Sequence, residues 1–88
     1  NTNGIVMPSA GKVIAISVSC ASSSSATAQA YSPNLASVLG SVSLSSSVSN
    51  YAIISSSNTF SAGDRIYGRI SSGTMNDTGN ITFWVKFD

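Results

Sequence analysis

The chain has 88 residues, of which only 8% are charged, and its formal net charge is +1. This length fits one small domain over residues 1–88, and the weak charge gives no electrostatic basis for binding nucleic acid or a membrane surface. Histidine and glutamate are absent while 21 residues are serine, so the surface must owe its polarity to hydroxyl and amide groups. A mean hydropathy of +0.23 predicts that sister chains cover part of the apolar surface.

The segment "GKVIAISVSC" (11–20) predicts the first strand. Apolar residues recur at every second position, which is the period of a strand with one buried face. The residues assigned to that face are Ile14, Ile16, Val18 and Cys20. Val13 falls on the opposite face. Cys20 is the only cysteine, and we interpret it as a small apolar residue of this strand.

Two serine-rich segments, 21–25 and 45–47, predict turns because each one separates periodic stretches. Between them, residues 26–32 predict a strand of small residues that stops at Pro33. Residues 37–44 predict another half-buried strand. Its buried face is expected to hold Val38, Gly40, Val42 and Leu44.

The rest of the chain predicts three more strands, at 48–55, 64–71 and 81–87. The segment 72–80 separates the last two and is rich in Gly, Asn, Asp and Thr, so it predicts a loop. Trp84 falls on the outer face of the last strand. Short strands separated by turns in this way predict an all-β, antiparallel, jelly-roll-like β-sandwich of about seven or eight strands.

Gly63 and Asp64 stand at the entry to the 64–71 strand. The carboxylate of Asp64 is expected to accept a hydrogen bond from nearby backbone and so to fix the turn. A calcium site is the less favoured interpretation, because calcium requires several oxygen ligands and one carboxylate supplies few of them.

Both arginines of the chain fall on one face of the 64–71 strand, because Arg65, Tyr67 and Arg69 alternate with Ile66 and Gly68. A solvated surface is one interpretation of this face. A contact surface is the other, since Arg and Tyr are enriched where proteins meet.

Catalysis is not expected. A nucleophile needs a neighbouring base, and the chain has neither histidine nor glutamate. Its side-chain carboxylates, Asp64, Asp77 and Asp88, lie in separate parts of the sequence with no sign that they converge. The single cysteine and the lack of a run of oxygen ligands predict no metal and no cofactor.

The loop and corner residues are the natural place for a ligand, because loops carry specificity on a rigid sandwich. Asparagine, serine and aromatic side chains suit a neutral saccharide, which is bound by hydrogen bonds and by stacking. The candidate ligand-facing residues are Tyr31, Asn34, Asn76, Asp77 and Asn80.

Three segments together carry a resemblance. They are "GIVMPSAGKVIAISVS" (4–19), "FSAGDRIYGRIS" (60–71) and "ITFWVKF" (81–87). This series resembles the jelly-roll domains at the C-termini of bacteriophage tail-fibre, receptor-binding and capsid-decoration proteins, which are similar in turn to the trimeric heads of complement C1q and tumour necrosis factor.

The resemblance implies a homotrimer with one sandwich per chain around a threefold axis. It also implies that the strand after Gly63 and the end of the chain lie close to sister subunits. The residues of this expected trimer interface are Arg65, Tyr67, Arg69 and Trp84. Because the chain opens at Asn1 without methionine, we expect it to be the C-terminal piece of a longer fibre or knob protein.

The expected function is therefore that of a non-enzymatic bacteriophage virion protein, a trimeric fibre head that binds a host-surface glycan during adsorption. Its expected place is the virion, on the tail fibre or capsid surface and outside cells, with other virion proteins as further partners and no insertion into a membrane. Two alternatives stay open. One is a trimeric capsid decoration or cement protein with a structural role, and the other is a monomeric carbohydrate-binding module.

Overall fold

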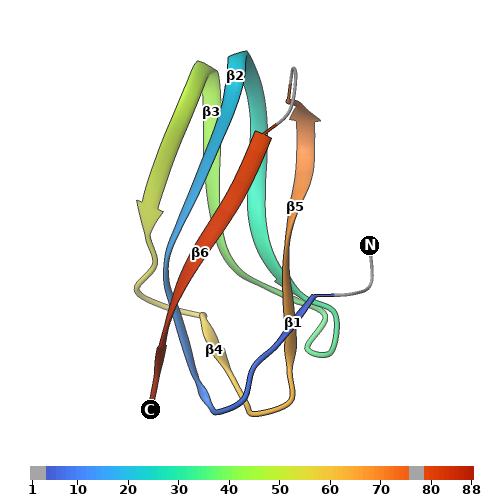
Figure 1. Ribbon diagram of the computed structural model, residues 1–88, viewed down its shortest axis with the longest axis vertical. Helices are drawn as coiled ribbons and strands as arrows, with labels where there is room; N and C mark the ends of the chain where they lie inside the picture. Colours follow the sequence, from blue (N-terminus) through green and yellow to red (C-terminus); the bar gives the residue numbers. More distant parts are fainter. Residues whose placement is uncertain (1–3, 76–78) are drawn as a thin grey trace.

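The computed structural model describes residues 4–75 and 79–88 (Figure 1). Its strands are β1 (Ile5–Val6), β2 (Gly11–Ser32), β3 (Ser37–Ile53), β4 (Thr59–Phe60), β5 (Arg65–Thr74) and β6 (Gly79–Phe87). Every ladder between them is antiparallel and they form one sheet. The all-β, antiparallel class predicted from the sequence is therefore confirmed. None of the described residues belongs to a helix that could span a lipid bilayer.

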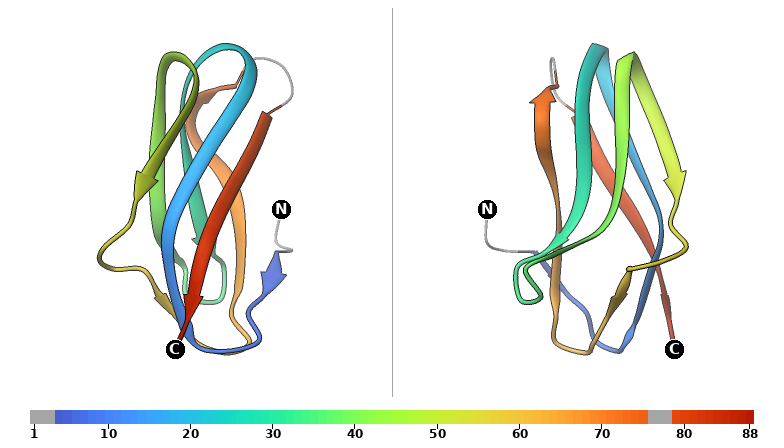
Figure 2. Two further views of the ribbon diagram at one scale, coloured as in Figure 1. Left: turned by 60° about the vertical axis from the view of Figure 1, so that its left-hand side comes forward. Right: turned by 180° about the vertical axis from the view of Figure 1, so that it is seen from behind.

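The long hairpin of β2 and β3 is bent in its middle. The ladder between the two strands is irregular from Ser19 to Ala26, and Ser46 bends β3 at the same level with a φ of 49°. Figures 1 and 2 show both strands turning over at this point. The serine segments 21–25 and 45–47 are therefore bends inside continuous strands, not turns between separate ones, because pairing resumes beyond them. The four strands predicted at 11–20, 26–32, 37–44 and 48–55 are therefore two, β2 and β3, and the two-residue strands β1 and β4 were not predicted. The described residues thus form six strands where about seven or eight were expected.

The bend divides the sheet into two halves. The first part of β2, residues 11–20, pairs with β4, β6 and the end of β3, and we call this the β6 half. The second part, residues 25–32, pairs with β5 and the start of β3, and β1 extends β5 at its edge. We call this the β5 half. Seen from behind, the β5 half lies in front of the β6 half (Figure 2).

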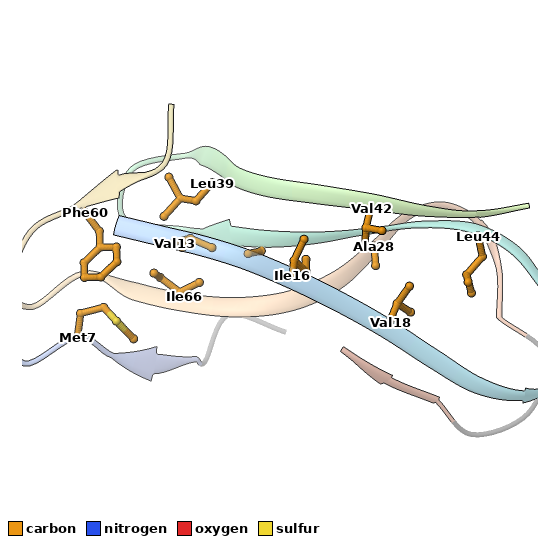
Figure 3. Packing of buried hydrophobic residues seen from close by; sticks show 11 residues of the cluster. Met7, Val13, Ile16, Val18, Ala28, Leu39, Val42, Leu44, Phe60 and Ile66 are labelled. Atoms are coloured by element: carbon orange, nitrogen blue, oxygen red, sulfur yellow. The ribbon is translucent and has the colours of Figure 1, made fainter. Parts of the chain in front are cut away.

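The core fills the space between the halves. Figure 3 shows Met7 and Phe60 at one end of the core and Val18 and Leu44 at the other. Burial of a large apolar side chain stabilises a fold by about 1.5–3 kcal/mol, so this layer supplies the main attraction between the halves. The buried residues are Met7, Val13, Ile16, Val18, Ala28, Ala30, Leu39, Val42, Leu44, Phe60 and Ile66.

A row of small residues lets the halves approach each other closely. Gly68, Ala30 and Gly40 are neighbours across β5, β2 and β3. A methyl group added at Gly68 would lie 2.8 Å from the side chain of Ile81, and one at Gly40 would lie 2.9 Å from that of Ile54. Both contacts are too short for carbon atoms, so the space that these glycines leave open is already filled from the other half.

Two β-bulges change the predicted faces. In the ladder of β2 with β6, β2 has one extra residue between Val13 and Ala15. In the ladder of β2 with β3, β3 has one extra residue between Val38 and Gly40. An extra residue shifts the alternation by one position. As a result Val13 and Leu39 are buried, whereas Val13 was expected on the outer face and Val38 in place of Leu39.

The predicted ends of the later strands also differ from the observed ones. β3 ends at Ile53, two residues earlier than expected. β5 continues to Thr74 and β6 begins at Gly79, so the strands enter the predicted 72–80 loop from both sides.

Candidate functional site

The folded sheet has two outer faces, one on each half, and the predicted site residues divide between them. Tyr31, on β2, and the β5 residues belong to the β5 half, and Asn34 follows in the turn after β2. Trp84 and Asn80 belong to β6 on the other half. The remaining two ligand candidates, Asn76 and Asp77, lie outside the described residues.

On the β5 half, Arg69 is fixed by two cross-strand contacts. The ladder sets Arg69 opposite Gln29 and Tyr67 opposite Tyr31, and such partners have Cβ atoms about 5 Å apart. The guanidinium carbon of Arg69 lies 3.7 Å from the centroid of the Tyr31 ring. Its Nε donates a hydrogen bond of 3.0 Å to Oε1 of Gln29. The orientation of the guanidinium plane is therefore determined.

The same face continues through an aromatic pair to the second arginine. The rings of Tyr31 and Tyr67 meet edge to face, with centroids 5.7 Å apart, a favourable arrangement for aromatic side chains. Beyond them, the backbone N–H and the Nε of Arg65 donate to Oδ1 of Asn34 at 2.8 and 3.2 Å. We call this surface the Arg–Tyr face. Its members are Gln29, Tyr31, Asn34, Arg65, Tyr67 and Arg69.

The turn before β5 sets where the Arg–Tyr face begins. Gly63 has a φ of 90°, a conformation that side-chain-bearing residues avoid. Oδ2 of Asp64 accepts a hydrogen bond of 2.8 Å from the backbone N–H of Ser61. Met7 closes the arrangement, because its N–H donates to the Asp64 carbonyl and its carbonyl accepts from the Gly63 N–H, each at 2.8 Å.

The Arg–Tyr face carries positive charge without a carboxylate among its members. Of the carboxylate side chains in the described residues, that of Asp64 accepts from the turn backbone, and Asp88 follows β6 on the other half. Arg65 and Arg69 are both partly buried, so bulk water screens them less than it would fully exposed cations.

The outer face of the β6 half is apolar in its centre. Across the three strands, Ala15 lies between Trp84 and Ile53, and Ser17 lies between Thr82 and Tyr51. The exposed fractions are 49% for Trp84, 71% for Tyr51 and 72% for Ile53. We call this surface the Trp84 face, and its members are Ala15, Ser17, Tyr51, Ile53, Thr82 and Trp84. Lys12 and Lys86 lie opposite each other in the ladder of β2 and β6, at one end of this face.

Sequence reasoning identified Trp84 but missed Tyr51 and Ile53. They stand two positions apart in 48–55, which is the spacing of residues on one face of a strand. Their strand was predicted, but its partner was not. Only the pairing with β2 brings them into line with Trp84.

Cys20 lies beside the bend of β2 rather than on either named face. It is partly buried against the core, and its Sγ donates to the Ser22 carbonyl at 3.1 Å and to Oγ of Ser24 at 3.4 Å. The described residues enclose no pocket, and they include no group of three or more His, Cys, Asp or Glu side chains able to hold a metal ion.

The structure redistributes the residues that the sequence assigned to two sites. Trp84 is separated from the arginines with which it was grouped, and Tyr31 and Asn34 join them instead. Asn80 lies opposite Ser19 on the β6 half, away from both ligand candidates of the β5 half. Comparisons of the chain with family models, with curated proteins and with solved structures found no match.

Proposed function

We propose that this chain is a non-enzymatic head domain of a bacteriophage virion fibre, which assembles as a homotrimer and binds a host-surface glycan during adsorption. In this proposal sister chains cover the Trp84 face, and the Arg–Tyr face stays open to the glycan. The domain then acts outside cells, on the surface of the virion.

The bent hairpin supports the jelly-roll part of this proposal. A jelly roll has two facing antiparallel sheets. In this chain, β2 and β3 run through both halves of the folded sheet, and β5 and β6 are added to different halves. The sequence motifs that resemble phage head domains lie on β2, on the entry to β5 and on β6.

The observation that carries the proposed assembly is the exposure of Trp84, Tyr51 and Ile53 on one face of the sheet. Small residues between them leave no other side chain to cover them. Complete burial of a large apolar side chain is worth about 1.5–3 kcal/mol, and exposed patches of this kind mark surfaces that bind other proteins. A face with aromatic residues and little charge at its centre suits a contact between subunits.

The Arg–Tyr face supports the proposed recognition of a glycan. Its side chains already hold one another through the contacts of Arg69 with Tyr31 and of Arg65 with Asn34. A preorganised surface loses less conformational entropy when a ligand binds. The two tyrosine rings offer stacking surfaces, and the amide and hydroxyl groups offer hydrogen bonds to sugar hydroxyls. The proposed site keeps Tyr31 and Asn34 from the predicted ligand-facing residues and adds the neighbouring side chains of β2 and β5.

A specific observation favours a second candidate, the monomeric carbohydrate-binding module. Trp84 and Tyr51 lie on the same open face, where their rings offer a platform for sugar rings. In that case the Trp84 face binds the glycan and no sister chain covers it. A capsid decoration protein, in contrast, would form the trimer but bind no glycan.

Light scattering at micromolar concentration and in moderate salt tests the proposed assembly. We expect three copies for the wild type and a shift towards one copy for Trp84→Thr and Tyr51→Thr, since threonine keeps the strand but removes the apolar area. Leu35→Thr is the matched control, because Leu35 is also exposed but lies in the turn after β2. It should leave the trimer intact.

The same variants separate the three functions when glycan-array binding is measured alongside mass. A trimer that binds a glycan supports the fibre head. A single copy whose glycan binding is lost in Trp84→Thr contradicts the proposal and supports the monomeric module. A trimer that binds no glycan supports the decoration protein instead.

A further inference from the structure

We propose that the glycan bound by the Arg–Tyr face is an acidic one, a polymer of carboxylate-bearing sugars, and that Arg69 pairs with one of its carboxylates. This inference rests on the proposed glycan-binding function and adds the chemical class of the sugar. Nothing in the overall charge of the chain, +1, points to an anionic ligand, so the argument depends on how the cations are placed.

Arg69 is held in a way that uses one edge of its guanidinium and leaves the other available. Its guanidinium carbon lies over the ring of Tyr31, and its Nε donates to Oε1 of Gln29. The two terminal nitrogens have no hydrogen-bond partner among the described residues. Two parallel N–H groups of a guanidinium match the two oxygens of a carboxylate. Because the plane is already fixed, this pairing costs little further side-chain entropy.

The surroundings of Arg69 strengthen such a pair. The side chain is partly buried beside Tyr31, so a bound carboxylate would be partly shielded from water and from screening by salt. No carboxylate belongs to the described part of this face to compete for the guanidinium. A fully exposed arginine on a flexible stem would bind an anion more weakly.

The second arginine extends the positive charge along one line. Arg65 stands four residues before Arg69 on the same strand face, and four residues of a strand span about 13 Å. The Nε of Arg65 donates a hydrogen bond of 3.2 Å to Oδ1 of Asn34. Two oriented cations in line with an aromatic pair between them fit a polymer with repeated carboxylates better than they fit a single small anion.

Neutral hydroxyl groups beside the arginines favour a saccharide over an acidic peptide. Ser41 lies opposite Gln29, and Oγ1 of Thr27 and Oγ of Ser43 are 3.2 Å apart in the adjoining row. Such groups can donate to and accept from sugar hydroxyls. Tyr67 adds a phenolic hydroxyl between the two arginines.

The distribution of the cations supplies a matched control. Apart from the two arginines, the chain has only Lys12 and Lys86 as cationic side chains, and both lie at the end of the Trp84 face. Lys86→Gln and Arg69→Gln therefore remove the same charge from opposite faces. Binding that depends only on net charge responds equally to both.

The test measures the affinity of the full chain by isothermal titration calorimetry, first for oligogalacturonate and then for the same oligomer after methyl esterification of its carboxylates. We expect the acid to bind at least tenfold more tightly than the ester. Arg69→Gln should remove that difference, and Arg69→Lys should restore only part of it, because lysine keeps the charge but loses the planar fork. Lys86→Gln should have no effect. Melting curves check that each variant is folded.

Each other outcome overturns the inference in a recognisable way. Equal affinity for acid and ester, or equal losses in Arg69→Gln and Lys86→Gln, contradicts the acidic class. If a neutral glycan still binds in either case, the proposed function stands. If neither these probes nor an array of neutral and acidic glycans binds, the inference and the proposed recognition fail together.

Discussion

The guanidinium carbon of Arg69 lies 3.7 Å from the centroid of the Tyr31 ring, although the two residues belong to different strands. The contact joins β5 to β2 on the outer side of the sheet, while Ile66 of β5 and Ala28 of β2 both belong to the core on the inner side. Tyr31 therefore has two roles, because it orients a cation and also stabilises the pairing of the strands.

The stabilising role of Tyr31 can be measured separately from ligand binding. Tyr31→Ala removes the cation–π contact and the edge-to-face contact with Tyr67, and we expect it to lower the free energy of unfolding by about 1–3 kcal/mol. Urea denaturation gives this difference. Tyr31→Phe keeps both ring contacts and should stay within about 0.5 kcal/mol of the wild type. A similar loss in both variants would assign the effect to the hydroxyl instead.

Asn58 provides a buried polar link between the end of β3 and the start of β2. It is only 5% exposed. Its side-chain Nδ2 donates to the Val13 carbonyl at 2.6 Å, and its main-chain carbonyl accepts from the Val13 N–H at 2.9 Å. Asn58→Ala leaves the first of these acceptors short of a donor, and we expect a loss of about 1–3 kcal/mol in denaturant unfolding. Asn50→Ala is the control, because Asn50 is exposed and water can replace its bond to Ser43. Equal losses would contradict the role of burial.

Substitution of Ser32 by alanine is expected to stabilise the fold, in contrast to the substitution of Asn58. The side chain of Ser32 is fully buried, and its Oγ has no hydrogen-bond partner among the described residues. Ser32→Ala removes a desolvated hydroxyl and should stabilise the fold by about 1 kcal/mol, which corresponds to a rise in Tm of about 4–8 °C for a domain of this size. Ser24→Ala should destabilise it, since Ser24 is also buried but its Oγ donates to the Ser22 carbonyl at 3.0 Å. A fall in Tm for both would mean that Ser32 has a partner.

The turn before β5 allows a prediction about a single carboxylate. Asp64→Ala removes the acceptor of the Ser61 N–H, and we expect it to cost about 0.5–2 kcal/mol, by analogy with the loss of a helix-capping side chain. Asp88→Ala makes the same change of charge at the end of β6 and should stay within about 0.5 kcal/mol of the wild type. Chemical denaturation of both variants in the same buffer makes the comparison. A loss of equal size in the control would point to net charge.

Local chemistry explains which parts of the fold were predictable from sequence. The period of two residues identified the strand segments, and the Gly63 and Asp64 turn depends on neighbours in the chain. The bulges were not predictable, because Val13 and Ile14 are both apolar, as are Val38 and Leu39. Either member of each pair could have been buried, and the packing of the two halves decides which one is.

The composition of the two faces was less predictable, because it depends on pairing between distant segments. Nothing near Tyr31 in the sequence indicates that it lies opposite Tyr67, or that Arg69 lies on its ring. The serine segments were misleading for a related reason. Serine is typical of turns, but here the strands continue through the bend and pair again beyond it.

The course of β2 has a consequence for the rate at which the protein folds. Gly11 pairs with Phe87 and Lys12 with Lys86, so the first long strand of the described chain cannot complete its hydrogen bonds until the last strand has joined it. Closing so large a loop costs entropy before any contact compensates for it, and folds dominated by distant pairings form in milliseconds to seconds. During that interval the first part of β2 exposes an unpaired apolar edge. Folding yield should therefore fall as the protein concentration during refolding rises, because edges of this kind pair with one another.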